Sequence, residues 1–288
     1  GGAHHFLTWK PLLAMHGYGI KNIMEVRPDD VGVISEAPAI LGEGLFVANG
    51  KISWLDIEAR QVFHNQRTYP LPYDIPSVIF EADESSLLLG THRGIARLSN
   101  SGSLTHLVSL PGHDPEKFRL NDGCKLSDGS YLVGSMARRE AGNLAGSIYR
   151  FTLSGEVTRY KWACHIPNSF VELEDGSVLI SDSLKRVVFQ VNFKQNDIQS
   201  KPWYHCQGPE TPDGGCVLPN GQVALAMWGG ACVRLFRPNG TPIEDLPVPV
   251  FQPTNCKYES LSKALIISSA SVELSDELMH RYPLSGHV

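Results

Sequence analysis

A polar residue placed just ahead of a tight turn recurs along this chain, and this repeat constrains the fold more than any other feature. The polar residue, here called the anchor, stands eight positions before a glycine or serine at the turn, and a short alternating strand follows. Five anchors share this step: Ser77, Asn121, Asn168, Asp213 and Thr254. A sixth anchor, Glu43, comes seven residues before Gly50.

Successive anchors lie 34 to 47 residues apart. The segments between them read as short strands broken by Asp-Gly, Asn-Gly and Ser-Gly turns, and nothing long has helical periodicity. Six such units predict an all-β chain folded as a six-bladed β-propeller. A sandwich or barrel with coincidental hairpin spacing is the alternative. The segment VGVISEAP, ahead of the first anchor, is expected to add an outer strand to the last blade and close the ring.

We expect residues 24–288 to form this single propeller domain. Residues 1–23 are treated as an N-terminal extension outside the fold, either vector-derived or disordered. That segment begins with glycine and lacks both the sustained apolar core and the small-residue cleavage site of a secretory signal.

The charge balance excludes two classes of partner. With 25 Lys+Arg against 30 Asp+Glu, the net charge of -5 offers no basic stripe for nucleic acid. No apolar run approaches the roughly 18 residues that a membrane span needs. The six cysteines lack C-x-x-C spacing and read as small buried side chains in a reducing compartment. These features predict a cytoplasmic monomer or homodimer.

The anchors should converge. In a propeller the first strand of each blade lines the central channel, so equivalent positions from all blades meet near one mouth. Every anchor side chain carries oxygen, and two are carboxylates. Such a set suits a hard divalent cation such as calcium, magnesium or manganese. Without a cation, carboxylates pushed together would repel, and one would take up a proton.

Ordinary turn chemistry is the competing interpretation, because Asn and Asp are common beside turn glycines. It explains a single anchor as well as a ligand role does. It explains the whole set less well, since Glu43 is not a typical turn residue. Prolines directly before four anchors also suggest a shared, stiff approach to each: Pro76, Pro167, Pro212 and Pro253.

Several motifs together carry a family signature. They are LGEG, RLNDGCKLSDGSYLVGSM, IPNS followed by LEDGSVLISDS, and PDGGCVLPNGQVALAMWGGACVRLFRPNG, with LPVPVFQPTNC after it. From about residue 35 to the end, the sequence resembles the SMP-30/gluconolactonase/luciferin-regenerating-enzyme family. The resemblance implies a six-bladed propeller that hydrolyses a sugar lactone, such as gluconolactone, to the aldonic acid.

The resemblance also implies roles for particular residues. Glu43, Asn168 and Asp213 would hold one divalent metal ion, with calcium the first choice and zinc, manganese or magnesium as alternatives. Arg119 and Asn121 would bind the hydroxyl and ring oxygens of the substrate.

Two positions depart from the family pattern. Members often have an acidic substrate-binding residue three positions after the methionine of a GTM motif, where this chain has Arg139 followed by Glu140. Either a one-residue shift lets Glu140 contact the substrate, or the pocket is more basic and favours an anionic lactone. Ser169 also replaces the usual glycine after Asn168, which narrows the backbone conformations available there.

Lactone opening needs a polarised carbonyl, an activated water and a stabilised oxyanion, and a bound cation supplies the first and third. We expect Asp213 to accept the water proton, Arg119 to orient substrate oxygens and Asn121 to donate to and accept from a polyol. Two other functions stay open. One is a non-enzymatic calcium-binding propeller, and the other is a hydrolase of different lactones or esters on the same metal site.

Overall fold

The computed structural model describes residues 31–288, apart from the side chain of Glu140. In this part of the chain the alternating segments of the repeat form 22 strands, and within each sheet the strands that follow one another in sequence pair antiparallel. The predicted boundary near residue 24 and the predicted extension 1–23 lie outside the described residues.

Five sheets have four strands each. The first contains β1 (Gly42–Ala48), β2 (Lys51–Asp56), β3 (Gln61–His64) and β4 (Arg67–Pro70). The second contains β5 (Pro76–Ala82), β6 (Ser86–Thr91), β7 (Gly94–Ser99) and β8 (Leu104–Val108). The third contains β9 (Phe118–Lys125), β10 (Tyr131–Ala137), β11 (Gly146–Phe151) and β12 (Val157–Cys164).

The fourth sheet contains β13 (Pro167–Glu172), β14 (Val178–Asp182), β15 (Val187–Lys194) and β16 (Asp197–His205). The fifth contains β17 (Thr211–Val217), β18 (Val223–Trp228), β19 (Cys232–Phe236) and β20 (Pro242–Pro247). A two-stranded sheet, β21 (Gln252–Glu259) and β22 (Ala264–Ala270), follows. Within residues 31–288 the helical elements are the 3-10 turn η2 (Arg139–Ala141) and α1 (Asp276–Arg281).

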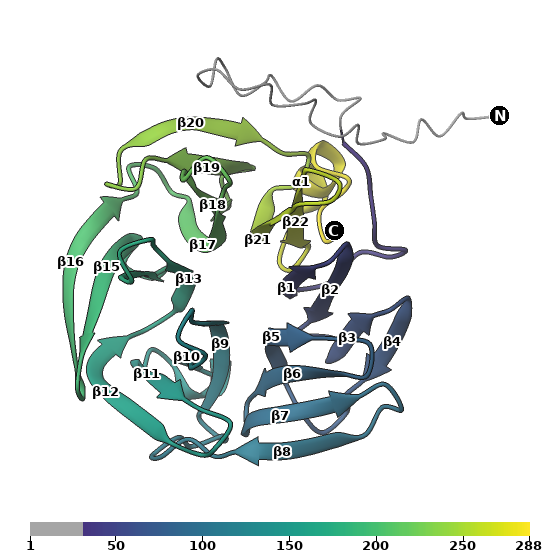
Figure 1. Cartoon of the computed structure of the whole chain (residues 1–288). Helices are drawn as coiled ribbons and strands as arrows, with labels where there is room; N and C mark the ends of the chain where they lie inside the picture. Colours follow the sequence, from purple (N-terminus) through teal and green to yellow (C-terminus); the bar gives the residue numbers. More distant parts are fainter. Residues whose placement is uncertain (1–30) are drawn as a thin grey trace.

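The sheets are arranged in a ring around a central axis, as the view along that axis shows (Figure 1). The first strand of every sheet lies on the inside of the ring, where a propeller has its channel, and each of these inner strands contacts the next around the ring. The inner strands are β1, β5, β9, β13, β17 and β21. The molecule is therefore an all-β propeller, as the repeat predicts.

The prediction of six blades is wrong, because the described chain forms five four-stranded blades. The remaining sector holds the two-stranded sheet, whose strand β21 contacts both β17 and β1. The segment expected to supply an outer strand does not pair as one: the amides of Ile34 and Ser35 both donate to the carbonyl of Val288. Two bonds to one carbonyl do not make a ladder.

Closure of the ring depends on polar contacts between distant parts of the sequence. Thr254 Oγ1 on β21 donates to the Gly42 carbonyl of β1 at 2.5 Å. Ser35 Oγ hydrogen-bonds His287 Nδ1 at 3.0 Å and accepts from the Val288 amide at 3.1 Å. These bonds join the start and the end of the described chain.

Apolar side chains fill the spaces between neighbouring sheets, as the alternating pattern of the strands requires. Phe80 of the second sheet packs edge-on against Tyr131 and Phe151 of the third, with ring centroids 5.6 and 5.3 Å apart. Leu132 and Ile148 are fully buried on the other side of the third sheet, against the fourth. The core is thus a set of layers around the channel, and truncating one such leucine to alanine should cost about 2–5 kcal/mol.

A β-bulge interrupts every inner strand within two residues of its anchor. In β17, for example, Pro212 and Gly215 are three residues apart while their partners on β18, Met227 and Leu225, are two apart. Comparable shifts occur in the other five inner strands. Because a bulge bends the strand and turns side chains out of the regular ladder, the shared bulge gives the backbone near each anchor a similar local irregularity.

The described residues include no helix with the length and apolar character needed to cross a membrane.

Candidate functional site

All six anchors are buried near the start of an inner strand, and neighbouring inner strands contact one another around the ring. Their exposed fractions lie between 0% and 7%: Glu43 6%, Ser77 1%, Asn121 7%, Asn168 5%, Asp213 5% and Thr254 0%. Two anchors serve the backbone, because Ser77 Oγ donates to the Gly90 carbonyl and Thr254 Oγ1 to that of Gly42. The other four form a connected polar group.

A chain of hydrogen bonds connects the third, fourth and fifth sheets. Arg119 Nη1 donates to Asn121 Oδ1 at 2.9 Å, and Asn121 Nδ2 donates to Asn168 Oδ1 at 3.0 Å. Asn168 Nδ2 in turn donates to Ser183 Oγ at 2.8 Å, which donates to the Pro212 carbonyl at 2.6 Å. Two of the three predicted substrate-binding residues, Arg119 and Asn121, are therefore connected by hydrogen bonds to the predicted metal ligand Asn168. Asn168 Oδ1 keeps a second lone pair for a ligand.

The carboxyl groups of Glu43 and Asp213 interact strongly. Burial, and then repulsion from Asp213 and Asp122, raises the pKa of Glu43 well above its usual value. Burial and the Asp122 charge likewise raise the pKa of Asp213, against the opposing effects of the Gly214 amide and a hydrogen bond with Glu43. Two buried carboxylates in contact cannot both ionise freely unless a positive charge compensates them.

Arg119 is a cation that interacts with both of these carboxyl groups. Burial lowers the pKa of its guanidinium, while the charges of Glu43 and Glu58 oppose that effect. Its Nη1 donates to the Leu120 carbonyl at 3.1 Å as well as to Asn121. Within the described residues these bonds use one nitrogen, so the remaining N–H groups can donate to a ligand.

Ser169 holds a backbone conformation that favours glycine, and sequence reasoning missed its role. Its φ is +77°, and Phe170 follows with a φ of +48°. The Ser169 hydroxyl hydrogen-bonds Ser181 Oγ at 2.8 Å and the Asp213 carbonyl at 2.7 Å. The serine therefore connects the fourth sheet to the strand that carries Asp213. Its replacement of the expected glycine was the available signal.

Two more residues near the anchors were not predicted. Ser183, which joins Asn168 to Pro212, is 7% exposed. Asp122, directly after Asn121, is 6% exposed, and one of its oxygens accepts from the Gly123 amide at 2.8 Å. Burial raises the Asp122 pKa to about 6. Its position inside the polar run RLNDG was a weak signal for it.

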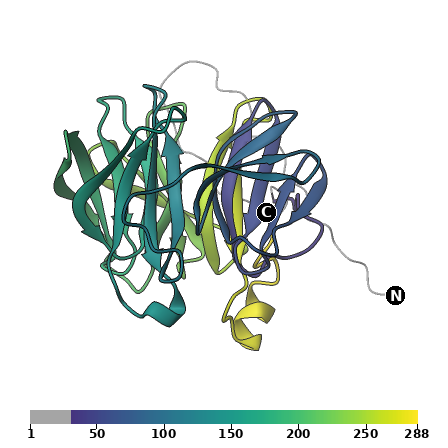
Figure 2. The same cartoon turned by 90° about the horizontal axis from the view of Figure 1, so that it is seen from below.

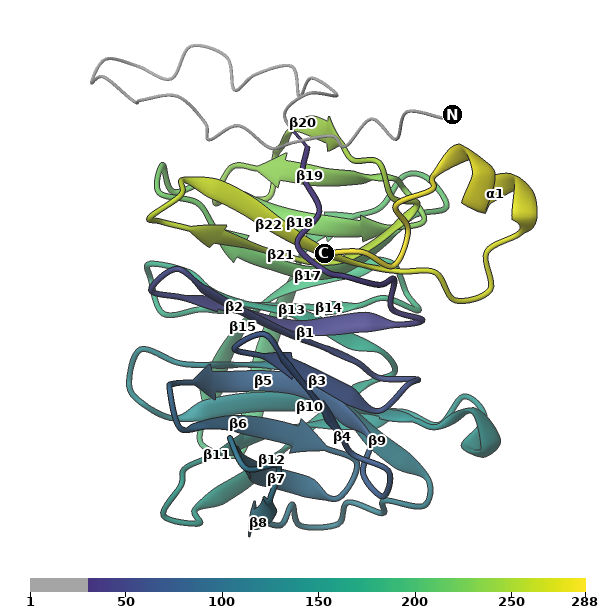
Figure 3. The ribbon, with the colours of Figure 1, turned by 90° about the vertical axis from the view of Figure 1, so that its right-hand side faces the viewer.

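The departure at Arg139 lies at the rim of the same mouth. Figures 2 and 3 show η2 and α1 protruding from one face of the propeller. Arg139 Nη2 lies 3.2 Å from Glu273 and 3.8 Å from Glu58, and its side chain is 70% exposed. The loop after β10 thus reaches both the first sheet's loop and the C-terminal segment. The predicted contact of Glu140 with substrate concerns a side chain outside the described residues.

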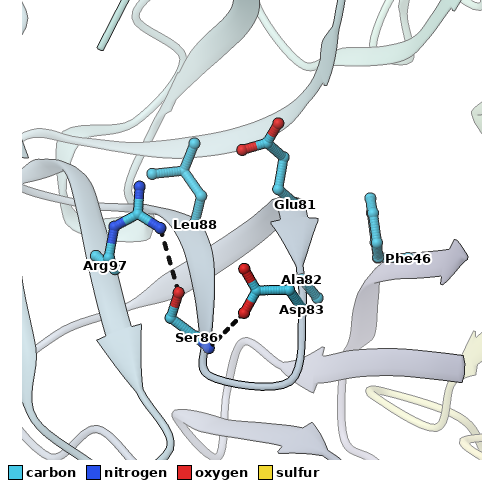
Figure 4. Close-up of a pocket in the computed structure, with 7 residues that line it drawn as sticks. All are labelled: Phe46, Glu81, Ala82, Asp83, Ser86, Leu88 and Arg97. Atoms are coloured by element: carbon cyan, nitrogen blue, oxygen red, sulfur yellow. Dashed lines mark hydrogen bonds between the residues drawn. The ribbon is translucent and has the colours of Figure 1, made fainter.

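A pocket of about 310 Å³ lies elsewhere, between the first two sheets (Figure 4). It is lined by Phe46, Glu81, Ala82, Asp83, Ser86, Leu88 and Arg97. Its polar groups bond to one another and to a neighbouring lysine: Arg97 donates to Ser86 Oγ, the Ser86 amide donates to Asp83, and Glu81 pairs with Lys125. It contains none of the predicted site residues.

No group of three or more His, Cys, Asp or Glu side chains within residues 31–288 is arranged to hold a metal. The predicted set differs in kind, because it combines two carboxylates with the amide oxygen of Asn168. Buried, mutually repelling carboxylates beside a neutral oxygen are a donor set that fits a hard divalent cation.

Comparison with known proteins decides the family. The model of the SMP-30/gluconolactonase/LRE-like region matches residues 41–271, which is most of the chain. The chain belongs to the SMP-30/gluconolactonase/LRE-like family. Family membership confirms the resemblance, and the matched region runs from β1 to just beyond β22.

Relatives of this SMP-30/gluconolactonase/LRE-like chain carry lactonase names. L-arabinolactonase of Azospirillum brasilense is 28% identical over 274 residues, covering 89% of each chain. A putative sugar lactone lactonase of Rhizobium meliloti is 27% identical, covering 88% of this chain and 90% of the relative. The solved structure of regucalcin from Agrobacterium tumefaciens, described as a calcium-binding protein, superposes with a TM-score of 0.79 at 25% identity. That match covers 88% of this chain and 90% of regucalcin.

Proposed function

We propose that this protein hydrolyses a sugar lactone to the corresponding aldonic acid at the channel mouth, on a divalent cation held by Glu43, Asn168 and Asp213. The enzyme class rests on the family and on relatives named lactonases, so the chain is an ester-bond hydrolase that opens lactones. One feature supports the site: the buried carboxyl groups of Glu43 and Asp213 interact with each other and with Arg119, which is hydrogen-bonded to the Asn121–Asn168 pair.

A bound cation would polarise the lactone carbonyl and lower the pKa of a water molecule. The protein groups supply the rest of the chemistry. Asp213 Oδ1 accepts from the Gly214 amide. With a cation in place of the hydrogen bond to Glu43, the Asp213 carboxylate would be able to take the proton of the attacking water. Arg119 donates to the oxygen that gains charge as the tetrahedral centre forms. Asn121, already fixed by its three bonds, keeps a lone pair of Oδ1 with which to orient a substrate hydroxyl group.

Calcium is the proposed cation, with zinc, manganese and magnesium as alternatives. Two carboxylates and one amide oxygen are hard donors, which favours calcium, magnesium or manganese over softer metals. The similarity to regucalcin supports calcium. The proposed substrate is an aldonolactone, and pentonolactones are the first to test because L-arabinolactonase is among the relatives. Glu140 as a substrate contact, the cytoplasmic location and the monomer or homodimer state stay predictions from the sequence.

A lactonase assay with and without chelator tests the proposal. Purified protein is incubated with gluconolactone and a set of pentonolactones, and acid release is followed after EDTA treatment and after adding back calcium, manganese, magnesium or zinc. We expect activity that EDTA abolishes and one metal restores. Asp213→Asn should reduce kcat by at least about 100-fold, because it removes both a ligand and the base.

The matched control is Asp175→Asn, which removes a carboxylate from the turn between β13 and β14, at the other end of β13 from Asn168. The lactonase rate of the Asp175→Asn variant should equal that of the wild type. A wild-type rate in Asp213→Asn would overturn the assignment of Asp213.

A non-enzymatic calcium-binding propeller is the second candidate, because the similar regucalcin structure is described only as a calcium-binding protein. Calorimetry separates the two functions. Tight calcium binding, lost in Glu43→Gln, with no acid release across the lactone set would favour the binding protein. Release from esters other than sugar lactones would instead favour a different hydrolase on the same site.

A further inference from the structure

Two cysteines lie side by side on neighbouring inner strands. Cys216 is on β17 and Cys256 is on β21, and both belong to one apolar cluster. Cys256 Sγ lies 3.5 Å from the carbonyl oxygen of Ala224, and Ala224 is the residue that pairs directly with Cys216 in the sheet. The Cys256 sulfur therefore reaches the backbone beside Cys216. Both thiols are free.

Lys257 brings a positive charge to this pair. Its Nζ donates to the carbonyl of Gly215 at 2.6 Å, and Gly215 directly precedes Cys216. A hydrogen bond from the Cys256 thiol, opposed by burial and assisted by the Lys257 charge, lowers the pKa of the Cys216 thiol. The same hydrogen bond and burial raise the pKa of Cys256 well above its usual value. The two thiols thus have opposite tendencies to ionise.

The other four cysteines are electrostatically different. Burial raises the pKa of Cys206 to about 11, of Cys124 and Cys232 to about 12, and that of Cys164 further. Cys124 is the most informative comparison, because it stands three residues after the anchor of β9, as Cys216 does on β17, and is likewise partly exposed. Position on an inner strand is therefore not enough. The Lys257 charge acts on Cys124 as well, so the neighbouring Cys256 thiol is what distinguishes Cys216.

We propose that Cys216 and Cys256 form a peroxide-reactive dithiol site, a function separate from lactone hydrolysis. The Cys216 thiolate attacks one oxygen of hydrogen peroxide; the S–O bond forms, the O–O bond breaks, and hydroxide leaves and takes a proton. The product is Cys216 sulfenic acid. The Cys256 sulfur then attacks the Cys216 sulfur; the S–S bond forms, the S–O bond breaks, and water leaves with the thiol proton. Two thiols and one peroxide give one disulfide and two waters.

The disulfide would act on the channel wall next to the anchors. A Cβ added to Gly214 would lie 2.3 Å from Cγ of Asn255, so β17 and β21 already approach closely at this level. A covalent bond between the sulfurs must draw the strands together or tilt them, and Asp213 is only three residues from Cys216. We expect the oxidised protein to bind divalent cations several-fold more weakly than the reduced protein.

Peptide mapping of the oxidised chain tests the site without depending on lactonase activity. Reduced full-length protein is treated with a few equivalents of hydrogen peroxide, free thiols are alkylated, and the unreduced digest is analysed by mass spectrometry. We expect a Cys216–Cys256 cross-linked peptide about 2 Da lighter than the two thiol peptides together, reversed by dithiothreitol. Cys124→Ser, the matched control, should form the same cross-link.

Two variants separate the steps. Cys256→Ser should accumulate a sulfenic acid at Cys216 that dimedone traps, whereas in Cys216→Ser dimedone should trap none at Cys256.

A second pair of variants tests the effect of the Lys257 charge. Lys257→Met should slow iodoacetamide alkylation of Cys216 several-fold, while Lys185→Met, which changes an exposed lysine, should not.

The proposal is overturned if peroxide leaves Cys216 reduced, if Cys124 reacts as fast as Cys216, or if wild-type Cys216 proceeds to the sulfinic acid without the cross-link. The thermal unfolding of each variant is compared with that of the wild type, and a variant that does not fold is replaced by its alanine counterpart.

Discussion

At the scale of single residues, Ser169 is unusual because it combines a left-handed backbone conformation with two buried side-chain hydrogen bonds. A φ of +77° costs a serine roughly 1–2 kcal/mol relative to glycine. Its hydroxyl offsets that cost by bonding Ser181 and the Asp213 carbonyl. The backbone strain at Ser169, next to the proposed metal ligand Asn168, is therefore compensated by the hydrogen bond from the Ser169 hydroxyl to the Asp213 carbonyl.

Ser169→Gly and Ser169→Ala should separate the strain from the hydrogen bonds. Both variants lose the hydroxyl, but only glycine relieves the backbone. We expect Ser169→Ala to lower the free energy of unfolding by about 2–3 kcal/mol and Ser169→Gly by roughly 1 kcal/mol less, measured by urea denaturation. An alanine variant as stable as the glycine variant would contradict the proposed strain.

Asp122 predicts a pH dependence whose sign can be stated. Burial raises its pKa to about 6 in the folded protein, against the opposing effects of Lys257 and the Gly123 amide. The folded state then holds the proton more tightly than the unfolded state, so Asp122 contributes stability below pH ~4 that is lost as the pH rises through about 6. Asn cannot ionise and avoids this loss.

We therefore expect Asp122→Asn to match the wild type near pH 4 and to be more stable by up to about 3 kcal/mol near pH 8, in EDTA. Urea denaturation at several pH values gives this difference directly. A stability difference that stays constant from pH 4 to pH 8 would show that Asp122 is not a buried, titrating carboxyl group.

At the scale of elements, the bulge of each inner strand has a stronger effect on the position of the site residues than the regular part of the strand. Gly44, directly after Glu43, has a φ of +60° and leaves no room for a side chain: a Cβ would lie 2.6 Å from Leu55 Cδ2. Gly129, at the turn between β9 and β10, has a φ of +88°, and a Cβ there would meet nothing within 4 Å. Both glycines therefore have a positive φ, but only at Gly44 would an added side chain overlap with a neighbour.

This pair makes a controlled test of the bulge. Gly44→Ala should cost about 3 kcal/mol or more and weaken divalent-cation binding at least tenfold, because strain and overlap both move Glu43. Gly129→Ala should cost about 1 kcal/mol and leave cation binding unchanged. Chemical denaturation and calorimetry measure the two effects, and equal losses in both variants would refute a special role for the bulge in β1.

The elements also show which parts of the site a sequence can reveal. Asn121 and Asn168 could be predicted to meet because both precede their turns by eight residues, a local pattern that repeats with the blades. Ser169, Ser183 and Asp122 could not be placed in this way. Their roles depend on the bulge and on partners in neighbouring sheets, which no local spacing encodes.

At the scale of the whole molecule, closure of the ring is the feature that local patterns predicted least well. The strands and their turns follow from short-range alternation, and they were predicted correctly as an all-β propeller. The number of blades was not, because it depends on how residues 31–36 meet the last residues of the chain. That contact is made by a few polar groups around Val288, and no alternating strand pattern in the sequence predicts it.

Ser35 tests how much this closure contributes to stability. Its hydroxyl bonds His287 and the Val288 amide and is 8% exposed, whereas the exposed Ser101 hydroxyl bonds only the nearby Ser99. Ser35→Ala should lower the free energy of unfolding by about 1–3 kcal/mol, and Ser101→Ala by less than about 0.5 kcal/mol. Thermal and urea unfolding compare the two, and a Ser35→Ala protein as stable as Ser101→Ala would assign closure to other contacts.

The anchors also set the order in which function can arise during synthesis. Glu43 leaves the ribosome about 170 residues before Asp213, and Thr254 comes later still. No early fragment holds more than part of the donor set, so the nascent chain stays inert however well its first sheets have folded. Catalytic competence would then appear abruptly, once translation is nearly finished and the last hairpin has docked against the first.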